Sequence, residues 1–283
     1  DPTGFVIDDD LAIAPLAKLG WTVTRVPWTS NQGWDAFDLV IIRSPWDYQH
    51  HADAFLDVLD EIEASSAQLE NPAALVRWNL DKGYLRDLAS HGIPIVPTAW
   101  AHGLDSAPGG TLDRYFEEFG TDQLVVKPTV SANADDTFWL THPVEERTRT
   151  QLADTFRGRS CMVQPFVPAV VSEGEFSLFY FAGAYSHTIL KTPKPRDFRV
   201  QEEHGGLIRA VWPEPTLLAR ADDVMKTLSP APLYARVDFV RMQDGTFAVM
   251  EVELIEPALY LRMDADAPAR FAQAVDAWMS ERR

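Results

Sequence analysis

The sequence predicts an α/β fold made of several lobes, and three observations support this prediction. Short runs of β-branched and aromatic residues alternate with segments whose apolar residues recur at helical spacing. The chain has 283 residues, 46% of them hydrophobic and 24% charged, as in ordinary folded proteins. This length indicates about two domains, or a few tightly joined lobes, with ample material for a buried core.

Charge and cysteine content narrow the class of protein. Asp and Glu number 42 against 25 Lys and Arg, which leaves a formal net charge of -17. A chain this acidic repels polyanions, so nucleic acid and anionic membrane surfaces are poor partners. Apolar runs stay well short of the roughly 18 residues that a membrane helix needs. Cys161 is the single cysteine, which fits a reducing compartment, and we expect a cytoplasmic protein that could form a homodimer.

The first predicted lobe, residues 1–78, reads as a small open α/β sheet. Residues 11–19 have a helical pattern, 21–26 and 39–42 have strand patterns, and 51–65 repeat apolar residues at helical spacing.

The middle of the chain is predicted in two parts. Residues 79–122 form a linking part, with a helix at 79–89, extended chain at 93–99 and an amphipathic helix at 112–119. Residues 123–167 form a small lobe with strands at 124–127, 138–140 and 162–166 and a helix at 145–156.

The last predicted lobe, residues 168–283, is rich in antiparallel hairpins. Its elements are a hairpin of strands 175–182 and 185–190, a loop at 191–206, a helix at 216–228, a hairpin of strands 234–241 and 246–254, and a final helix at 268–280. A polar loop as long as 191–206 inside a compact domain is usually functional.

Lysines are scarce in this chain, and four of the six stand near glycine or proline turns: Lys82, Lys127, Lys191 and Lys194. Each is a candidate for binding a specific anion. Lys127 ends an apolar strand just before Pro128, although a solvated strand end explains it equally well. The small polar loop 129–137 could lay backbone N–H groups over phosphates, even though it has no glycine.

Three carboxylates on the last predicted hairpin form the sharpest pattern. Glu251 and Glu253 lie two residues apart on one strand and share a face, and counting from the turn brings Asp238 opposite Glu251. Carboxylates this close repel one another unless a cation joins them, and such oxygen ligands suit Mg²⁺. The alternative is a strand face exposed to solvent.

Arg199 lies in the polar segment 197–206, which ends in two glycines. A guanidinium group can bind phosphate or carboxylate through two parallel hydrogen bonds. His204 in the same segment reads as a surface residue, so we assign it no catalytic role.

A run of polar and aromatic residues ends a strand of the first lobe, where open α/β sheets bind ligands. The run comprises Arg43, Ser44, Trp46, Asp47 and Tyr48. Asp47 or Glu256 could receive a substrate ammonium group, and Arg43 or Arg236 a carboxylate. Packing between lobes explains Trp46 and Tyr48 equally well.

Taken in order, these segments resemble the ATP-grasp ligases, in particular the branch of prokaryotic glutathione synthetase and the RimK-like amino-acid ligases. The resemblance spans residues 71–260 and rests on NLDK at 79–82, LVVKP at 124–128, VQPFV at 163–167, DFR at 197–199, GG at 205–206, VD at 237–238 and MEVE at 250–253. It implies an ATP-grasp fold in which the N-terminal lobe precedes two lobes that clasp ATP.

The resemblance implies roles for the cations. Lys82 and Lys127 would bind the ATP phosphates, and Arg199 would steady the transferred phosphoryl group and the acyl phosphate. Lys127 and Arg199 are therefore the expected catalytic residues.

It also implies an adenosine site. Gln164, Phe166 and Val167 would lie on the strand that joins the ATP-holding lobes and would contact adenine. Glu173 or Glu175 would hold the ribose hydroxyl groups, and the sequence does not choose between them.

Asp238, Glu251 and Glu253 match the family's magnesium ligands, with two departures. The phosphate-covering loop is normally rich in glycine, but residues 131–136 contain none. The last metal position is usually Asn, and Glu253 stands in its place.

A subgroup is indicated by RSPWDY at 43–48, SEGEFSL at 172–178, YSH at 185–187, KTPK at 191–194 and ELIEP at 253–257. These motifs look like the ATP-grasp proteins that include the cyclo-ligase of D-cycloserine biosynthesis. The implied function is an ATP- and Mg²⁺-dependent, ADP-forming ligase that acts through an acyl phosphate on a small amino acid, such as cyclisation of O-ureido-D-serine for antibiotic biosynthesis. An intermolecular amino-acid or dipeptide ligase and a silent ATP-binding module are the alternatives.

Overall fold

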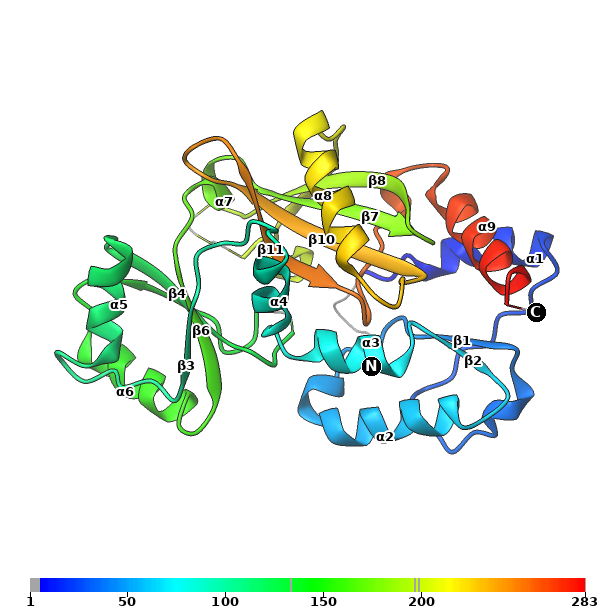
Figure 1. Ribbon diagram of the computed structural model, residues 1–283, viewed down its shortest axis with the longest axis horizontal. Coiled ribbons are helices and arrows are strands. Elements are labelled where there is room, and N and C mark those ends of the chain that lie inside the picture. Colours follow the sequence, from blue (N-terminus) through cyan, green and yellow to red (C-terminus); the bar gives the residue numbers. More distant parts are fainter. Residues whose placement is uncertain (1–5, 133, 196, 198, 283) are drawn as a thin grey trace.

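The computed structural model describes residues 6–132, 134–195, 197 and 199–282, and the strands of this part form three sheets (Figure 1). The predicted mixed α/β class is confirmed. None of the helices in the described ranges is long and apolar enough to cross a lipid bilayer.

The first lobe contains a parallel pair of strands. β1 (Leu39–Ile41) pairs with β2 (Gln68–Glu70), and α2 (Ala52–Glu63) runs between them, because parallel neighbours need a crossover connection. The side chains that α2 buries lie on one face: Phe55, Leu59 and Ile62. Two short 3₁₀ helices flank β1, η2 (Trp34–Ala36) and η3 (Tyr48–His50).

The strand predicted at 21–26 is wrong. Residues 22–25 are exposed, and the segment pairs with none of the described strands. Its β-branched residues fit a strand, but a strand needs a hydrogen-bonding neighbour that propensity alone does not supply. The helix expected at 11–19 is present as η1 (Asp9–Ala12) and α1 (Ile13–Lys18).

The single helix predicted at 79–89 is also wrong, because the chain forms α3 (Ala73–Leu80) and α4 (Tyr84–Ser90) instead. The backbone N–H of Lys82, between the two helices, donates to the carbonyl of Thr129 at 2.8 Å. This contact with a distant loop replaces a helical hydrogen bond and fixes Lys82 at the break.

The small lobe is a four-stranded antiparallel sheet in the order β3-β6-β4-β5, made of β3 (Ala99–His102), β4 (Gln123–Pro128), β5 (Phe138–Thr141) and β6 (Ser160–Pro165). The core under α5 (Thr111–Phe119) and α6 (Glu146–Thr155) contains Leu124 and Val126 of β4. Side chains alternate along a strand, so Lys127 points to the opposite face.

The five-stranded sheet is antiparallel in the order β11-β10-β7-β8-β9. It comprises β7 (Glu175–Phe181), β8 (Ala184–Thr192), β9 (Leu207–Ala210), β10 (Tyr234–Arg241) and β11 (Phe247–Glu253), with α7 (Ala169–Ser172), η4 (Glu202–His204) and η5 (Leu261–Met263) in its connections. Both predicted hairpins are confirmed, whereas β2, β9 and α7 were not predicted.

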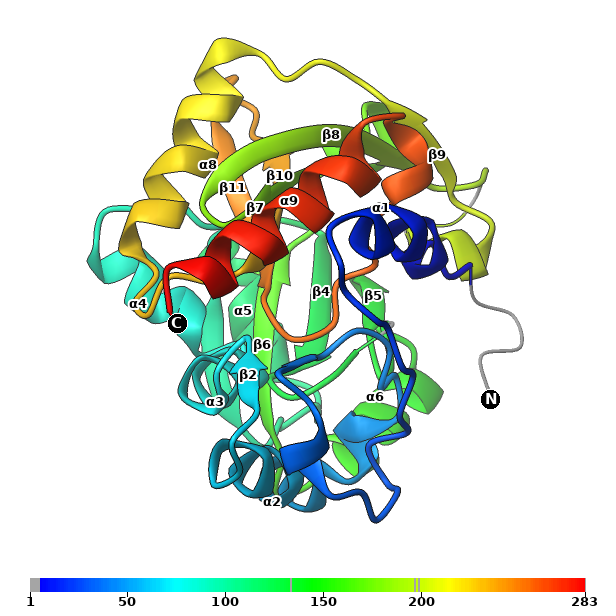
Figure 2. The same cartoon turned by 90° about the vertical axis from the view of Figure 1, so that its right-hand side faces the viewer.

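Two helices cover opposite faces of this sheet. Leu178 packs in the same core as α8 (Pro215–Thr227), whereas its neighbour Phe179 packs in the core of α9 (Ala267–Ser280). Figure 2 shows α9 lying across β7 and β8. Arg236 and Asp238 of β10 alternate with residues of the α8 core and so lie on the α9 face, beyond the cover of the helix.

Tyr234 and Asn71 join the first lobe to the large sheet. The Tyr234 hydroxyl lies 2.8 Å from the Ile42 carbonyl oxygen and 2.9 Å from that of Ile255. The Asn71 amide donates to the Leu254 carbonyl at 2.7 Å. These buried contacts fix the chain after β11 against the end of β1.

Candidate functional site

A cavity of about 210 Å³ lies where the three sheets meet. Most of the predicted site residues line it: Trp46, Tyr48, Lys82, Lys127, Gln164, Phe166, Val167, Glu175, Arg199, Arg236, Asp238, Glu251, Glu253 and Glu256. Residues from every predicted lobe therefore share one cavity.

Two ammonium groups enter the cavity from different elements. Lys82 lies at the break between α3 and α4, and its Nζ donates to the Ser131 carbonyl at 2.7 Å and lies 3.2 Å from Glu251 Oε1. Lys127 reaches the cavity from the end of β4. Burial lowers the pKa of Lys127, and the nearby Lys82 ammonium lowers it further against the pull of Glu251. The two ammonium groups repel each other, and a polyanionic ligand bound between them would relieve this repulsion.

The loop after β4 covers this side of the cavity. Ser131, Ala132, Ala134 and Thr137 line it, while Asn133 lies outside the described residues. Ala134 and Asp136 have positive φ values of 60° and 52°. Although the loop has no glycine, it adopts the left-handed backbone conformation that glycine usually supplies.

An apolar pocket adjoins the cation side. The Gln164 amide donates to Thr98 Oγ1 at 2.9 Å. The Phe166 ring stacks on Trp139 with centroids 4.6 Å apart. Gln164, Phe166 and Val167 provide the flat apolar surface and amide group that a purine base would need.

Glu173 and Glu175, the two candidates for ribose binding, differ in their position relative to the cavity. Glu175 lines the cavity, and its carboxylate lies 2.5 Å from Lys191 Nζ. Glu173 does not line the cavity, since Arg241 binds its carboxylate through contacts of 3.0 to 3.2 Å.

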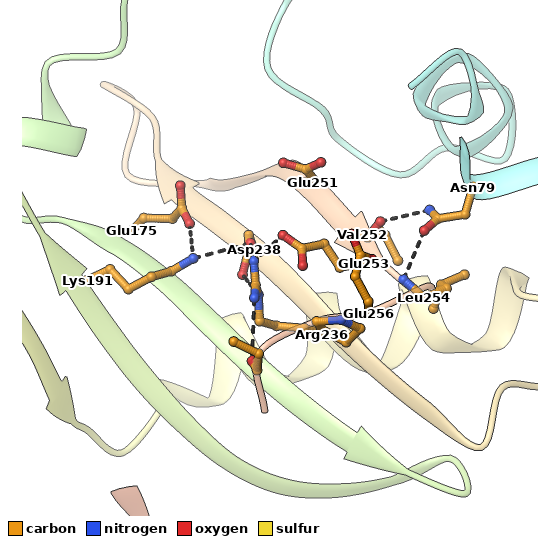
Figure 3. Close-up of polar contacts among 12 residues, drawn as sticks. Asn79, Glu175, Lys191, Arg236, Asp238, Glu251, Val252, Glu253, Leu254 and Glu256 are labelled. Carbon is orange, nitrogen blue, oxygen red and sulfur yellow. Dashed lines mark hydrogen bonds and ion pairs between the residues drawn. The ribbon is translucent and has the colours of Figure 1, made fainter. Parts of the chain in front are cut away.

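The carboxylates predicted to bind metal contact cations of the protein itself. Asp238 lies directly opposite Glu251 on the neighbouring strand. Arg236 binds Asp238 at 2.9 Å and also contacts Glu253, and Lys191 lies 3.3 Å from Asp238 (Figure 3). Among the described residues, no three His, Cys, Asp or Glu side chains form a metal-binding group in this arrangement.

The charges in this group act on one another. Although burial opposes it, the Arg236 guanidinium and the Lys191 ammonium hold the pKa of Asp238 at about 2. Burial, with Glu251 and Asp238 close by, raises the pKa of Glu253 to about 8 despite the Arg236 contact. The group therefore has an excess of negative charge that a bound cation would relieve.

Arg199 lines the cavity from the polar segment after β8. Its guanidinium donates to both oxygens of Asp197 at 3.1 and 2.9 Å. That pair fixes the guanidinium in the cavity lining. The neighbouring positions 196 and 198 lie outside the described residues.

The structure places three predicted substrate residues away from the cavity lining. Arg43 donates to Asp9 at 3.0 Å and to the Pro257 carbonyl at 2.7 Å, so it connects the first lobe to the chain that follows β11. Asp47 accepts from Trp28 Nε1 at 2.8 Å on the exposed side of its loop, and Ser44 is exposed. The same loop points Trp46 and Tyr48 inward.

Glu256 follows β11 and lines the cavity beside Tyr48. Its side chain is buried, and burial raises the pKa of Glu256 to about 7. The nearby Tyr48 hydroxyl opposes part of that rise in the pKa of Glu256.

Sequence reasoning missed several lining residues. Asn79 closes the wall of the cavity, because its side chain bonds the backbone of Val252 and Leu254 at 2.8 and 2.9 Å. Asn79 belongs to the NLDK motif, which could have identified it. Tyr260 lines the cavity with a φ of 46°, and no sequence signal marks it.

Comparisons with known proteins identify the family. A family model described as the N-terminal domain of D-cycloserine synthetase DcsG matches residues 2–71. The cycloserine biosynthesis protein DcsG of Streptomyces lavendulae is 34% identical over 290 residues, covering 97% of this chain and 95% of that protein.

Solved structures of related proteins have the same fold as this chain. A crystal structure of D-cycloserine synthetase DcsG superposes with a TM-score of 0.84 and 29% identity over 95% of this chain and 94% of that one. The ATP-grasp ligase PsnB, solved with a variant of its minimal precursor, Mg and ADP, has a TM-score of 0.66 at 15% identity over 95% and 94% of the two chains, which shows the shared fold. This chain therefore belongs to the D-cycloserine synthetase DcsG family and is an ATP-dependent ligase of the ATP-grasp fold.

Proposed function

We propose that the protein joins a carboxylate to a nitrogen atom of a small amino acid, forming ADP and phosphate through an acyl phosphate. Cyclisation of O-ureido-D-serine is the specific reaction that we propose, on the basis of the 34% identity to DcsG. The observation that carries the proposal is the convergence of Lys82, Lys127 and Arg199 on one cavity that also contains Asp238 and Glu251.

The cations suit each step of this chemistry. The substrate carboxylate attacks the γ-phosphorus of ATP, and negative charge gathers on the transferred phosphoryl group. Lys82, Lys127 and Arg199 would neutralise that charge, because phosphoryl transfer relies on positioning and electrostatic stabilisation. A nitrogen then displaces phosphate from the acyl phosphate, a step that needs no nucleophile from the protein.

Mg²⁺ fits the donor chemistry of the carboxylate group. Carboxylate oxygens are the ligands that Mg²⁺ prefers, and the Glu251 and Glu253 side chains keep 30% and 27% of their surface exposed. We propose that Asp238, Glu251 and Glu253 would hold it, and that bound Mg²⁺ would supply charge neutralisation on the ATP phosphates.

The nucleotide would lie along the small-lobe side of the cavity. Gln164, Phe166 and Val167 would contact adenine, and the burial of Glu175 in the lining makes it the better candidate for the ribose. Arg236 would meet the substrate carboxylate, and Trp46, Tyr48 and Glu256 would form the wall towards the first lobe.

ADP release with O-ureido-D-serine and Mg²⁺, followed by mass spectrometry of the product, tests the proposal. Retention of the oxygen-bound ureido nitrogen in the product and loss of the carbamoyl group as carbon dioxide and ammonia, with no added amine, supports cyclisation, whereas a requirement for a second amino acid supports an intermolecular ligase. Absence of ADP release with O-ureido-D-serine, in a preparation that turns over another amino acid, would remove the specific substrate.

A further inference from the structure

Glu256 differs from the other buried carboxylates in the described part of the chain. The carboxylates of Glu70, Glu175, Asp197 and Asp238 each form an ion pair with a Lys or Arg side chain. Glu256 is only 9% exposed and lines the cavity, yet none of the described Lys, Arg or His side chains pairs with it. Burial without a counter-ion disfavours the charged form of a carboxyl group, and a cation supplied by a ligand would favour that form again.

The surroundings of Glu256 further disfavour its negative charge. Glu251 and Glu253 raise the negative charge of the same region, and Figure 3 draws Glu256 in one group with them. The nearest guanidinium, that of Arg236, already binds Asp238 and Glu253. The cation whose charge acts on Glu256 is therefore already paired with other carboxylates.

The other contacts of Glu256 suit an organic ammonium group. The Tyr48 hydroxyl interacts with the carboxylate, and Trp46 Nε1 lies 3.4 Å from the backbone carbonyl oxygen of Glu256. Aromatic side chains near a carboxylate suit an organic ammonium ion.

We infer that Glu256 and Tyr48 form a subsite for the protonated primary amine of a free amino-acid substrate. This inference rests on the proposed function, because it assigns one end of the substrate in the same cavity. It makes the substrate an amino acid with a free α-amine: acylation of the amine removes the positive charge, so a residue inside a peptide is excluded. Because Tyr48 comes from the first lobe and Glu256 from the chain after β11, the amine would bridge the two.

Equilibrium binding provides the test. Isothermal titration calorimetry in the presence of Mg²⁺ and a non-hydrolysable ATP analogue compares O-ureido-D-serine, D-alanine and D-serine with their Nα-acetyl forms. The wild-type protein should bind at least one free amino acid about tenfold or more tightly than its acetylated form.

Three variants sharpen the test. Glu256→Gln should weaken binding of the free amino acid by about 10- to 100-fold, the range for a lost charged hydrogen bond, and leave the acetylated form unchanged. Tyr48→Phe should weaken binding only a few-fold, because it removes one donor and keeps the ring. Glu61→Gln, an exposed glutamate on α2, removes the same charge elsewhere and should bind as the wild type does.

Each outcome is decisive. Equal affinity for free and acetylated forms, unchanged binding in Glu256→Gln, or no binding of any free amino acid would overturn the subsite. A raised Mg²⁺ requirement in Glu256→Gln, with amino-acid affinity unchanged, would assign Glu256 to the metal instead. Glu256-dependent binding without any ADP release would retain the subsite and reject the proposed reaction, so the two failures can be told apart.

Discussion

Asp238 and Glu251 lie directly opposite each other on β10 and β11, at the point where the ladder shifts register after Asp238. Cross-strand carboxylates repel one another unless cations separate them. Arg236 and Lys191 bind Asp238, and Lys82 lies 3.2 Å from Glu251. The protein's own cations therefore stabilise the two carboxylates at this short separation.

Substituting Glu251 tests the metal assignment with little risk to the fold, because its side chain keeps 30% of its surface exposed. Glu251→Gln removes a charged oxygen ligand. The Mg²⁺ concentration for half-maximal ADP release should rise by about tenfold or more. Activity measured across a Mg²⁺ titration provides the check, and an unchanged midpoint would contradict the metal role.

Lys127 should be more important for activity than for stability. Burial lowers the pKa of Lys127, which means that the folded environment disfavours its charge. Lys127→Met keeps the length of the side chain and removes the ammonium. Turnover should fall about 100-fold or more, the cost of losing one preorganised charge at a phosphoryl-transfer site, while the melting temperature stays equal or rises.

The control for this variant is Lys226→Met, since Lys226 is an exposed lysine on α8 that pairs with Asp223. It should keep full turnover. A Lys127→Met protein with wild-type kcat/KM for ATP would show that Lys127 does not bind the ATP phosphates.

The two glutamates considered for the ribose should differ in a measurable way. Glu175 lines the cavity, whereas Glu173 pairs with Arg241 outside it. The wild-type enzyme should therefore prefer ATP over 2′-deoxy-ATP or 3′-deoxy-ATP, and Glu175→Gln should lose most of that preference. Glu173→Gln should keep it. The comparison of kcat/KM for the three nucleotides decides, and loss of discrimination in the Glu173 variant would reverse the assignment.

Local patterns predicted the elements whose periodicity is strong. The strands 175–182 and 185–190 alternate around Gly183, and β7 and β8 formed there. The helix predicted at 79–89 failed because Lys82 bonds Thr129, which lies 47 positions further along the chain. The partner that breaks the helix is distant in sequence, so no local window contains the information.

Some of the predicted site residues line the cavity and others do not. The order of short motifs brought Lys82, Lys127 and Asp238 together, and all three line the cavity. Arg43 and Asp47 belong to the same motif as Tyr48 but turn away, because Pro257 and Trp28 bind them. A motif records which residues are neighbours along the chain, whereas tertiary partners determine which of them face the ligand.

His187 should make stability depend on pH. The ring is buried on β8, stacks on Phe179 at 4.2 Å, and its Nε2 lies 3.0 Å from the Leu259 carbonyl. Burial lowers the pKa of His187 from 6.5 to about 4. Between these values the unfolded chain binds the proton and the folded chain does not, so stability falls as pH drops through this window.

The loss attributable to this ring should be about 2 kcal/mol between pH 7.5 and pH 5, from the linkage of proton binding to unfolding. Urea unfolding across that range measures it. His187→Gln cannot take up the proton, so its stability should fall less steeply with acid than that of the wild type, even if the substitution lowers stability overall. His91→Gln, at an exposed histidine, is the matched control and should keep the wild-type slope. If His187→Gln and the wild type lose equal stability on acidification, the buried ring is not the group that responds.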